Sequence, residues 1–98
     1  MDKPWKTEID DIVFCIDNNK KIMYHETINP ISLTIDKAYK VIDTSKYAFY
    51  DSTANYQIGF YYTITIVDDN GEKASYRAER FLTLQEWRQK QLQRLLEI

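Results

Sequence analysis

The chain has 98 residues, of which 44% are hydrophobic and 29% charged, and a net charge of −2, a composition typical of one ordinary globular domain. Its single cysteine, Cys15, excludes an internal disulfide and favours a reducing compartment, so we expect a cytoplasmic protein. No apolar run approaches the ~20 residues that a membrane-spanning helix needs, which argues against a membrane protein.

Aromatic residues are frequent, at 14% of the chain, whereas glycine and proline number only two each. Aromatic side chains favour strands, and a chain with few glycines and prolines has few breaks, so we expect long strands. We expect residues 1–98 to form a single domain. Residues 1–10 are polar apart from Trp5 and Ile9 and are predicted to form a loose N-terminal arm.

The first half of the chain carries two predicted strands separated by a long connection. Residues 12–17 are apolar on both faces, which is typical of a central strand. Residues 18–36 are rich in Asn, Lys and Thr, and this connection is long enough to hold a short strand or to wrap across one end of a barrel. The second strand is predicted over residues 38–43.

The next part of the chain carries an aromatic segment and a hairpin. Residues 44–59 interleave polar with aromatic side chains. Residues 60–68 alternate as a half-buried strand does, and Asn70–Gly71 follows as the strongest hairpin signal in the chain. We expect a two-residue turn there, followed by a return strand over residues 72–76.

A C-terminal amphipathic helix is predicted over residues 83–97. Thr83 with Glu86 three positions later forms a capping box, a strong signal for a helix start. Phe81, just before the cap, is expected to pack on the sheet. Six apolar side chains fall on one half of the helix surface: Leu84, Trp87, Leu92, Leu95, Leu96 and Ile98.

Three segments resemble a widespread set of small bacterial and phage proteins. They are VFCIDNN near the start, LTIDKAYKVID in the middle and ITIVDDNGEKASYRAERF near the end, and the similarity covers residues 12–17, 33–43 and 64–81. The resemblance implies a mainly β fold: a small antiparallel SH3-like barrel of about five strands over residues 11–81, with one C-terminal α-helix. It also implies a phage or mobile-element origin. Asp36 stands where those proteins usually have a turn glycine.

Signals for catalysis and metal binding are weak throughout the chain. His25 is the only histidine, so a zinc motif with two histidines cannot be assembled. One pair of a nucleophile and a base is possible, Cys15 with His25. The acidic stretch Asp68–Glu72 does not match the ligand spacing of a calcium loop, and two isolated glycines cannot make a phosphate loop. We therefore expect no enzyme, no catalytic or metal-binding residue and no cofactor.

Two surfaces are candidates for binding a partner. The first is aromatic, and comprises Tyr47, Phe49, Tyr50, Tyr56 and Tyr61. Tyrosine offers wide contact area and a polar tip, which suits recognition, but the same rings could close one end of a barrel, and both interpretations stay open. The second is the helix, where Trp87 and Arg88 would anchor a protein partner or a second copy in a homodimer, unless the stripe docks on its own barrel.

The net charge of the chain argues against nucleic-acid binding. Residues 1–72 carry −5 and residues 73–98 carry +3, and all four arginines lie in the second group. Tyrosines could stack on bases while Arg77, Arg80 and Arg88 contact phosphates, but a net charge of −2 is not the basic footprint that such binding needs. The same arginines could simply support the helix and its junction with the sheet. The sequence therefore predicts a non-enzymatic protein-binding accessory module; the alternatives are a single-stranded nucleic-acid-binding barrel and a self-assembling structural protein.

Overall fold

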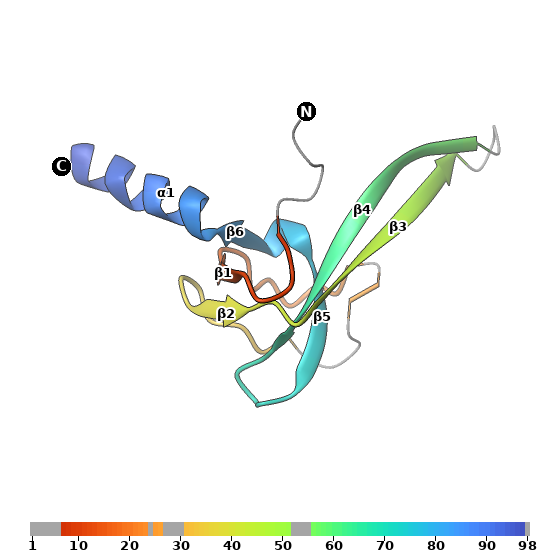
Figure 1. The fold of residues 1–98 in the computed structure, drawn as a ribbon, viewed down its shortest axis with the longest axis horizontal. Coiled ribbons are helices and arrows are strands. Elements are labelled where there is room, and N and C mark those ends of the chain that lie inside the picture. Colours follow the sequence, from red (N-terminus) through yellow and green to blue (C-terminus); the bar gives the residue numbers. More distant parts are fainter. Residues whose placement is uncertain (1–6, 24, 27–30, 52–55, 98) are drawn as a thin grey trace.

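The computed structural model describes residues 7–23, 25–26, 31–51 and 56–97, with the side chains of residues 49–51 and 56–58 excepted. In these residues the fold is mainly β: six strands form two antiparallel sheets, and one helix follows at the C-terminus (Figure 1). The expected class, a β-rich domain ending in a helix, is confirmed.

The first sheet has the order β2-β1-β6, with β1 (Ile12–Cys15) between β2 (Ala38–Lys40) and β6 (Phe81–Thr83). The central position predicted for the first strand is therefore confirmed, and its buried side chains are Val13 and Cys15. The strand ends before the predicted Asp17 because the amides of Ile16 and Asp17 both donate to the carbonyl of Arg80 instead of continuing the ladder.

The second sheet has the order β3-β4-β5, from β3 (Asp43–Asp51), β4 (Tyr56–Val67) and β5 (Lys73–Arg77). The aromatic segment supplies β3 and the start of β4, so it is a further pair of strands and not a loop. The predicted turn at Asn70–Gly71 is present, but as a three-residue loop that the Asp68 amide closes on the Glu72 carbonyl at 2.8 Å. Gly71 has a φ of 79°, which glycine adopts without strain.

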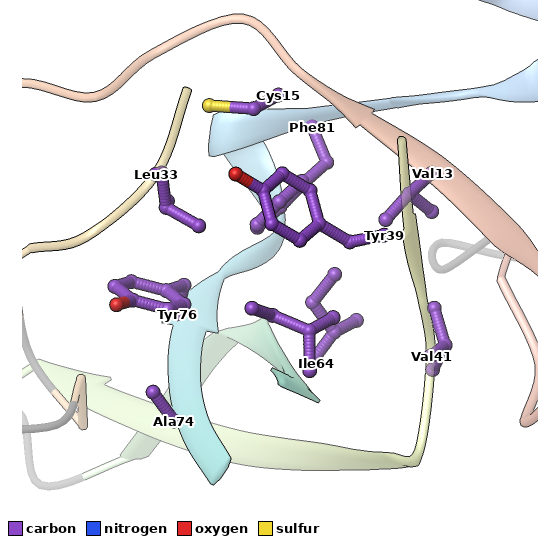
Figure 2. Packing of buried hydrophobic residues seen from close by; sticks show 10 residues of the cluster. Val13, Cys15, Leu33, Tyr39, Val41, Ile64, Ala74, Tyr76 and Phe81 are labelled. Atoms are coloured by element: carbon purple, nitrogen blue, oxygen red, sulfur yellow. The ribbon is translucent and has the colours of Figure 1, made fainter. Parts of the chain in front are cut away.

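The core lies between the two sheets (Figure 2), where side chains of the first sheet, such as Val13 and Tyr39, face Ile64 and Tyr76 of the second. The chain crosses from one sheet to the other at Val41 and Ile42, and the Ile42 amide donates to the Thr65 carbonyl at 2.8 Å. The buried apolar residues are Val13, Cys15, Leu33, Tyr39, Val41, Ile64, Ile66, Ala74, Tyr76 and Phe81, which confirms the core position expected of Phe81.

The expectation of a closed five-stranded barrel is not met. No closed barrel is detected among the described residues, because the edge strands of one sheet form no ladder with those of the other. The strand predicted over residues 38–43 is also divided, since β2 ends at Lys40 in the first sheet and β3 begins at Asp43 in the second.

Loops outside the strands are held by specific hydrogen bonds. Asp36 has a φ of 65°, a left-handed conformation that aspartate tolerates better than most residues, and its amide donates to the Cys15 carbonyl at 2.7 Å. The predicted loose arm is held in its described part, since Thr7 is buried and the Asp10 amide donates to the Val41 carbonyl at 2.8 Å. Residues 1–6 lie outside the described residues.

Helix α1 (Leu84–Leu96) begins at the predicted capping box, with the Thr83 hydroxyl accepting from the Glu86 amide at 3.2 Å. A short 3-10 helix, η1 (Ala78–Arg80), and strand β6 connect β5 to it, and neither was predicted. α1 extends away from the two sheets (Figure 1). Within the described part of the chain, no helix is long and apolar enough to cross a membrane.

Candidate functional site

β3 and the first half of β4 project from the body of the domain as a two-stranded ribbon (Figure 1). In the described structure β5 pairs with residues 63–67 of β4, so residues 56–62 have only β3 beside them. The radius of gyration is 14.9 Å, against about 13 Å for a compact domain of this length. A two-stranded hairpin by itself is only marginally stable in water. A partner that packs against this ribbon would stabilise it, so the ribbon is a candidate contact surface.

The ribbon carries a stack of three rings on its outer face, the face turned away from the core. Tyr47 and Tyr61 are directly opposite in the β3–β4 register, with ring centroids 5.7 Å apart. The His25 ring lies on Tyr47 at 3.8 Å with an interplanar angle of 5°, and it also stacks on Tyr61 at 5.2 Å. The structure therefore brings together two of the predicted aromatic residues and adds His25, which the sequence analysis considered only for zinc binding and catalysis.

Arg77 of β5 completes this group, which we call the aromatic cluster: His25, Tyr47, Tyr61 and Arg77. The guanidinium carbon of Arg77 lies 4.4 Å from the centroid of the Tyr61 ring, a cation–π arrangement. The guanidinium also pairs with the Glu79 carboxylate at 3.0 Å, and 18% of the side chain is exposed. Arg77 thus presents a partly neutralised cationic edge beside the rings.

The remaining predicted aromatic residues are placed only in part. Phe49 and Tyr50 belong to β3 and Tyr56 to β4, but their side chains lie outside the described part of the structure. The opposite face of the ribbon carries Phe60, which is 41% exposed, with the Lys46 ammonium 4.0 Å from its ring centroid. The ribbon is therefore aromatic on both faces, with a cation beside the rings of each.

On the helix, the two predicted residues have different environments. The Trp87 ring stacks on Phe14 of β1 at 4.3 Å with an interplanar angle of 12°, so it helps to attach the helix to its own sheet. Arg88 is exposed. Beyond them Leu92, Leu95 and Leu96 are 59%, 67% and 75% exposed, so the C-terminal half of the apolar stripe is not covered by the described residues.

The environment of Cys15 argues against the Cys–His pair. Cys15 is fully buried in the core, and burial raises the pKa of its thiol, which disfavours the reactive thiolate. The His25 ring lies on the outer face of the second sheet, against Tyr47.

Asp68, in the acidic turn, accepts the amides of Asn70 and Glu72. Among the described side chains, no group of three or more His, Cys, Asp or Glu residues could hold a metal ion.

Arg80 is the least exposed charged residue among those described, with a relative exposure of 0%. It forms an ion pair with the buried carboxylate of Glu26, so Arg80 is not available for the phosphate contact considered in the nucleic-acid alternative. Arg80 has a structural role, but its partners are Glu26 and the carbonyls of Asn19 and Lys21 in the connection after β1, not the helix. A buried guanidinium is satisfied by fixed acceptors and cannot reach a ligand in solvent.

Comparison of the chain with models of known protein families finds no match, and comparisons with curated proteins and with solved structures find no similar protein either. The aromatic cluster and the exposed end of the helix are therefore interpreted from their own geometry.

Proposed function

We propose that this chain is a non-enzymatic protein-binding accessory module that recognises its partner through the aromatic cluster on the outer face of the ribbon. The observation that carries the proposal is the convergence of three rings and one guanidinium from four separate segments (the β1–β2 connection, β3, β4 and β5) on the outer face of the ribbon. Tyrosine and arginine are the residue types that contribute most at protein interfaces, because they combine large contact area with directional polar groups.

We also propose the SH3-like class for the two sheets. Two three-stranded antiparallel sheets that share one core support this class, together with the sequence resemblance. The phage or mobile-element origin depends on that resemblance alone. Because small barrels of this kind serve many unrelated roles, the class adds nothing to the choice of partner.

Single-stranded nucleic acid is the alternative ligand for stacked rings. The charges nearby disfavour it, because Arg77 is already paired with Glu79 and Arg80 is buried against Glu26. A net charge of −2 supplies no compensating basic surface. A protein partner needs no such surface, so it remains the better proposal.

Tyr47→Ala is expected to abolish capture of the partner, with a loss of at least about 30-fold in affinity, because an aromatic anchor at an interface contributes about 2 kcal/mol or more. The measurement is an affinity pull-down from lysate of the source organism, in nuclease-treated and untreated halves, compared by quantitative mass spectrometry. The matched control is Phe60→Ala, which removes an exposed ring from the opposite face of the same ribbon.

A partner that survives nuclease and Phe60→Ala but is lost with Tyr47→Ala would support the proposal. Partners that vanish with nuclease would favour the nucleic-acid alternative. If Tyr47→Ala instead unfolds the domain, the ring belongs to the core and the surface proposal fails.

Self-association through the helix is a second candidate, favoured by the three exposed leucines of α1. Burying a Leu side chain contributes about 1.5–3 kcal/mol, so a shared stripe could hold a homodimer. Sedimentation at high protein concentration is expected to show a dimer that Leu96→Glu converts to a monomer with an unchanged melting temperature, since this side chain is 75% exposed. A strictly monomeric wild-type protein would exclude this candidate.

A further inference from the structure

Within the described residues, the outer edge of β3 is a long strand edge with no strand beside it. β3 is the terminal strand of the sheet β3-β4-β5, and no strand of the described residues pairs with its other side. It has nine residues, more than a typical edge strand, and it runs along the projecting ribbon. An exposed edge of this kind offers a row of backbone donors and acceptors to another strand.

The hydrogen bonds of the neighbouring strands indicate which residues of β3 face this edge. The Asp68 amide donates to the Glu72 carbonyl at 2.8 Å, so the even-numbered residues of β4 direct their backbone groups at β5 and the odd-numbered ones at β3. The β3–β4 register pairs these with odd-numbered residues of β3, and the Thr44 amide donates to the Asp43 carboxylate at 2.8 Å and not to β4. Backbone groups alternate between the two sides of an antiparallel strand. The amides and carbonyls of Thr44, Lys46 and Ala48 therefore face outward.

We propose that an extended segment of a protein partner adds to β3 as a fourth strand of this sheet, hydrogen-bonded to the outward backbone groups of Lys46 and Ala48. This inference rests on the proposed function and specifies the form of the partner: a peptide segment in β conformation, not a folded surface laid on the rings. Main-chain hydrogen bonds then provide affinity, and side chains on the two faces provide selectivity.

The charges of β3 favour a foreign strand over a second copy of this chain. A two-fold antiparallel pairing of β3 with itself has its greatest overlap when centred on Tyr47, and that register sets Asp43 opposite Asp51 at both ends. Moving the centre to Lys46 sets two lysines opposite each other. Like charges directly opposite on neighbouring strands are destabilising, so self-pairing is penalised in both registers.

The same geometry predicts which side chains the added strand should have. Lys46 is exposed and lies on the face with Phe60, whereas Tyr47 lies on the outer face with His25. Consecutive residues of the added strand would face these two sides in turn. An acidic residue opposite Lys46, next to an aromatic residue opposite Tyr47, satisfies charge on one face and ring stacking on the other.

The test uses a phage-displayed library of random dodecapeptides selected against the whole protein. Peptides with adjacent acidic and aromatic residues are expected to be enriched. Ala48→Pro should weaken the best synthetic peptide about tenfold or more, because proline removes the outward amide of an edge position. Tyr47→Ala is the companion variant, since it alters the outer face and leaves the strand edge intact.

Peptides methylated at one backbone nitrogen at a time give a second measurement that does not depend on the folding of Ala48→Pro. Strand addition predicts losses of about tenfold at every second position, and little change between them. Affinity that is insensitive to methylation at all positions overturns strand addition. If Tyr47→Ala still abolishes that binding, the proposed function stands without it.

Two further outcomes would also overturn the inference. A library that yields no binding peptide rejects a peptide strand as the ligand, while the lysate experiment with Tyr47→Ala decides the proposed function separately. Self-association in sedimentation that Ala48→Pro abolishes would identify a second copy as the strand on this edge.

Discussion

Replacing Arg80 by alanine is expected to lower the free energy of unfolding by about 3–5 kcal/mol, the typical cost of removing one partner from a buried ion pair. The side chains of Arg80 and Glu26 are 1% and 0% exposed. Without the guanidinium, the carboxylate of Glu26 would be left buried without its counter-charge, which is more costly than the loss of a surface contact.

Arg80 also holds the long connection between β1 and β2 to the rest of the fold. Its nitrogens donate to both carboxylate oxygens of Glu26, and to the carbonyls of Asn19 at 2.9 Å and Lys21 at 2.7 Å. Glu26 in turn accepts the amides of Met23 and Arg77 at 2.7 and 2.8 Å. Loss of Arg80 therefore releases the segment that positions His25 over Tyr47.

Chemical denaturation of Arg80→Ala, Arg80→Lys and Arg94→Ala measures this effect. Lysine should restore only part of the stability, because one ammonium cannot replace the planar fork of donors. Arg94→Ala is the matched control, since Arg94 is 49% exposed and lies 3.9 Å from Asp36. Exposed pairs of this kind contribute about 0–1 kcal/mol. A change below about 1 kcal/mol in Arg80→Ala would contradict the structural role assigned to it.

The Arg80–Glu26 ion pair makes the stability of the fold depend on pH in the acidic range. Burial acts to raise the pKa of the Glu26 carboxyl, but hydrogen bonds from Arg80 and from the amides of Met23 and Arg77 outweigh it and hold the pKa below its ordinary value of 4.5. A lowered carboxyl pKa stabilises the fold above the unfolded-state value, and this contribution is lost as the pH falls through the folded-state value. In Glu26→Gln this acid dependence should weaken.

Asp69→Ala is expected to destabilise the fold by about 2 kcal/mol, because several hydrogen bonds, one of them to a buried tyrosine, converge on one carboxylate. Asp69 accepts from Thr34 at 2.6 Å, from Lys37 at 2.5 Å and from the Tyr39 hydroxyl at 2.9 Å. These contacts attach the β4–β5 loop of one sheet to the segment that enters β2 of the other. Asp10→Asn is the control and should change stability little, since this side chain is 76% exposed and asparagine tolerates the φ of 77° at this position.

Tyrosine titration gives an independent reading of the Asp69 contact. Burial raises the pKa of Tyr39 from 10.0 to about 12. The hydrogen bond from the Thr34 amide opposes this increase, whereas the hydrogen bond to Asp69 and the charge of Asp69 add to it. The resulting stabilisation is fully present below pH 10.0 and is lost as the pH rises toward about 12. Removal of the carboxylate in Asp69→Ala should lower this pKa. An unchanged alkaline transition would contradict the contact.

The sequence alone determined the elements whose signals are local. The capping box of Thr83 and Glu86 places the start of α1 because both hydrogen bonds lie within one helical turn. The apolar residues on both faces of β1 predict its central position between two strands, which the structure confirms. Only the face of Val13 and Cys15 is buried, whereas Ile12 on the other face is 38% exposed. The alternation along β4 similarly predicts that Ile64 and Ile66 face the core.

Only the tertiary structure decided which residues meet at the aromatic cluster. A two-residue turn at Asn70–Gly71 would place Arg77 opposite Ile64, on the core face, whereas the three-residue loop places it opposite Thr63, on the outer face beside Tyr61. A shift of one residue reverses the face of every side chain in a strand. Hydrogen bonds from the Asp68 amide to the Glu72 carbonyl and from the Gly71 amide to the Asp68 carbonyl close the three-residue loop, and the hydrophobic periodicity of the strands does not predict them.

The position of His25 depends on contacts still further apart in the chain. Glu26 is held by Arg80, 54 residues away, and this pair brings the connection over the ribbon. Residues 18–36 have no hydrophobic period that would predict their path. In the described part of this connection, side-chain hydrogen bonds to partners far along the chain, such as Asn18 to the Leu33 carbonyl and Arg80 to Glu26, hold the backbone in place. Long-range pairing of this kind leaves no local trace in the sequence, so the site at which these segments converge could be recognised only in the folded chain.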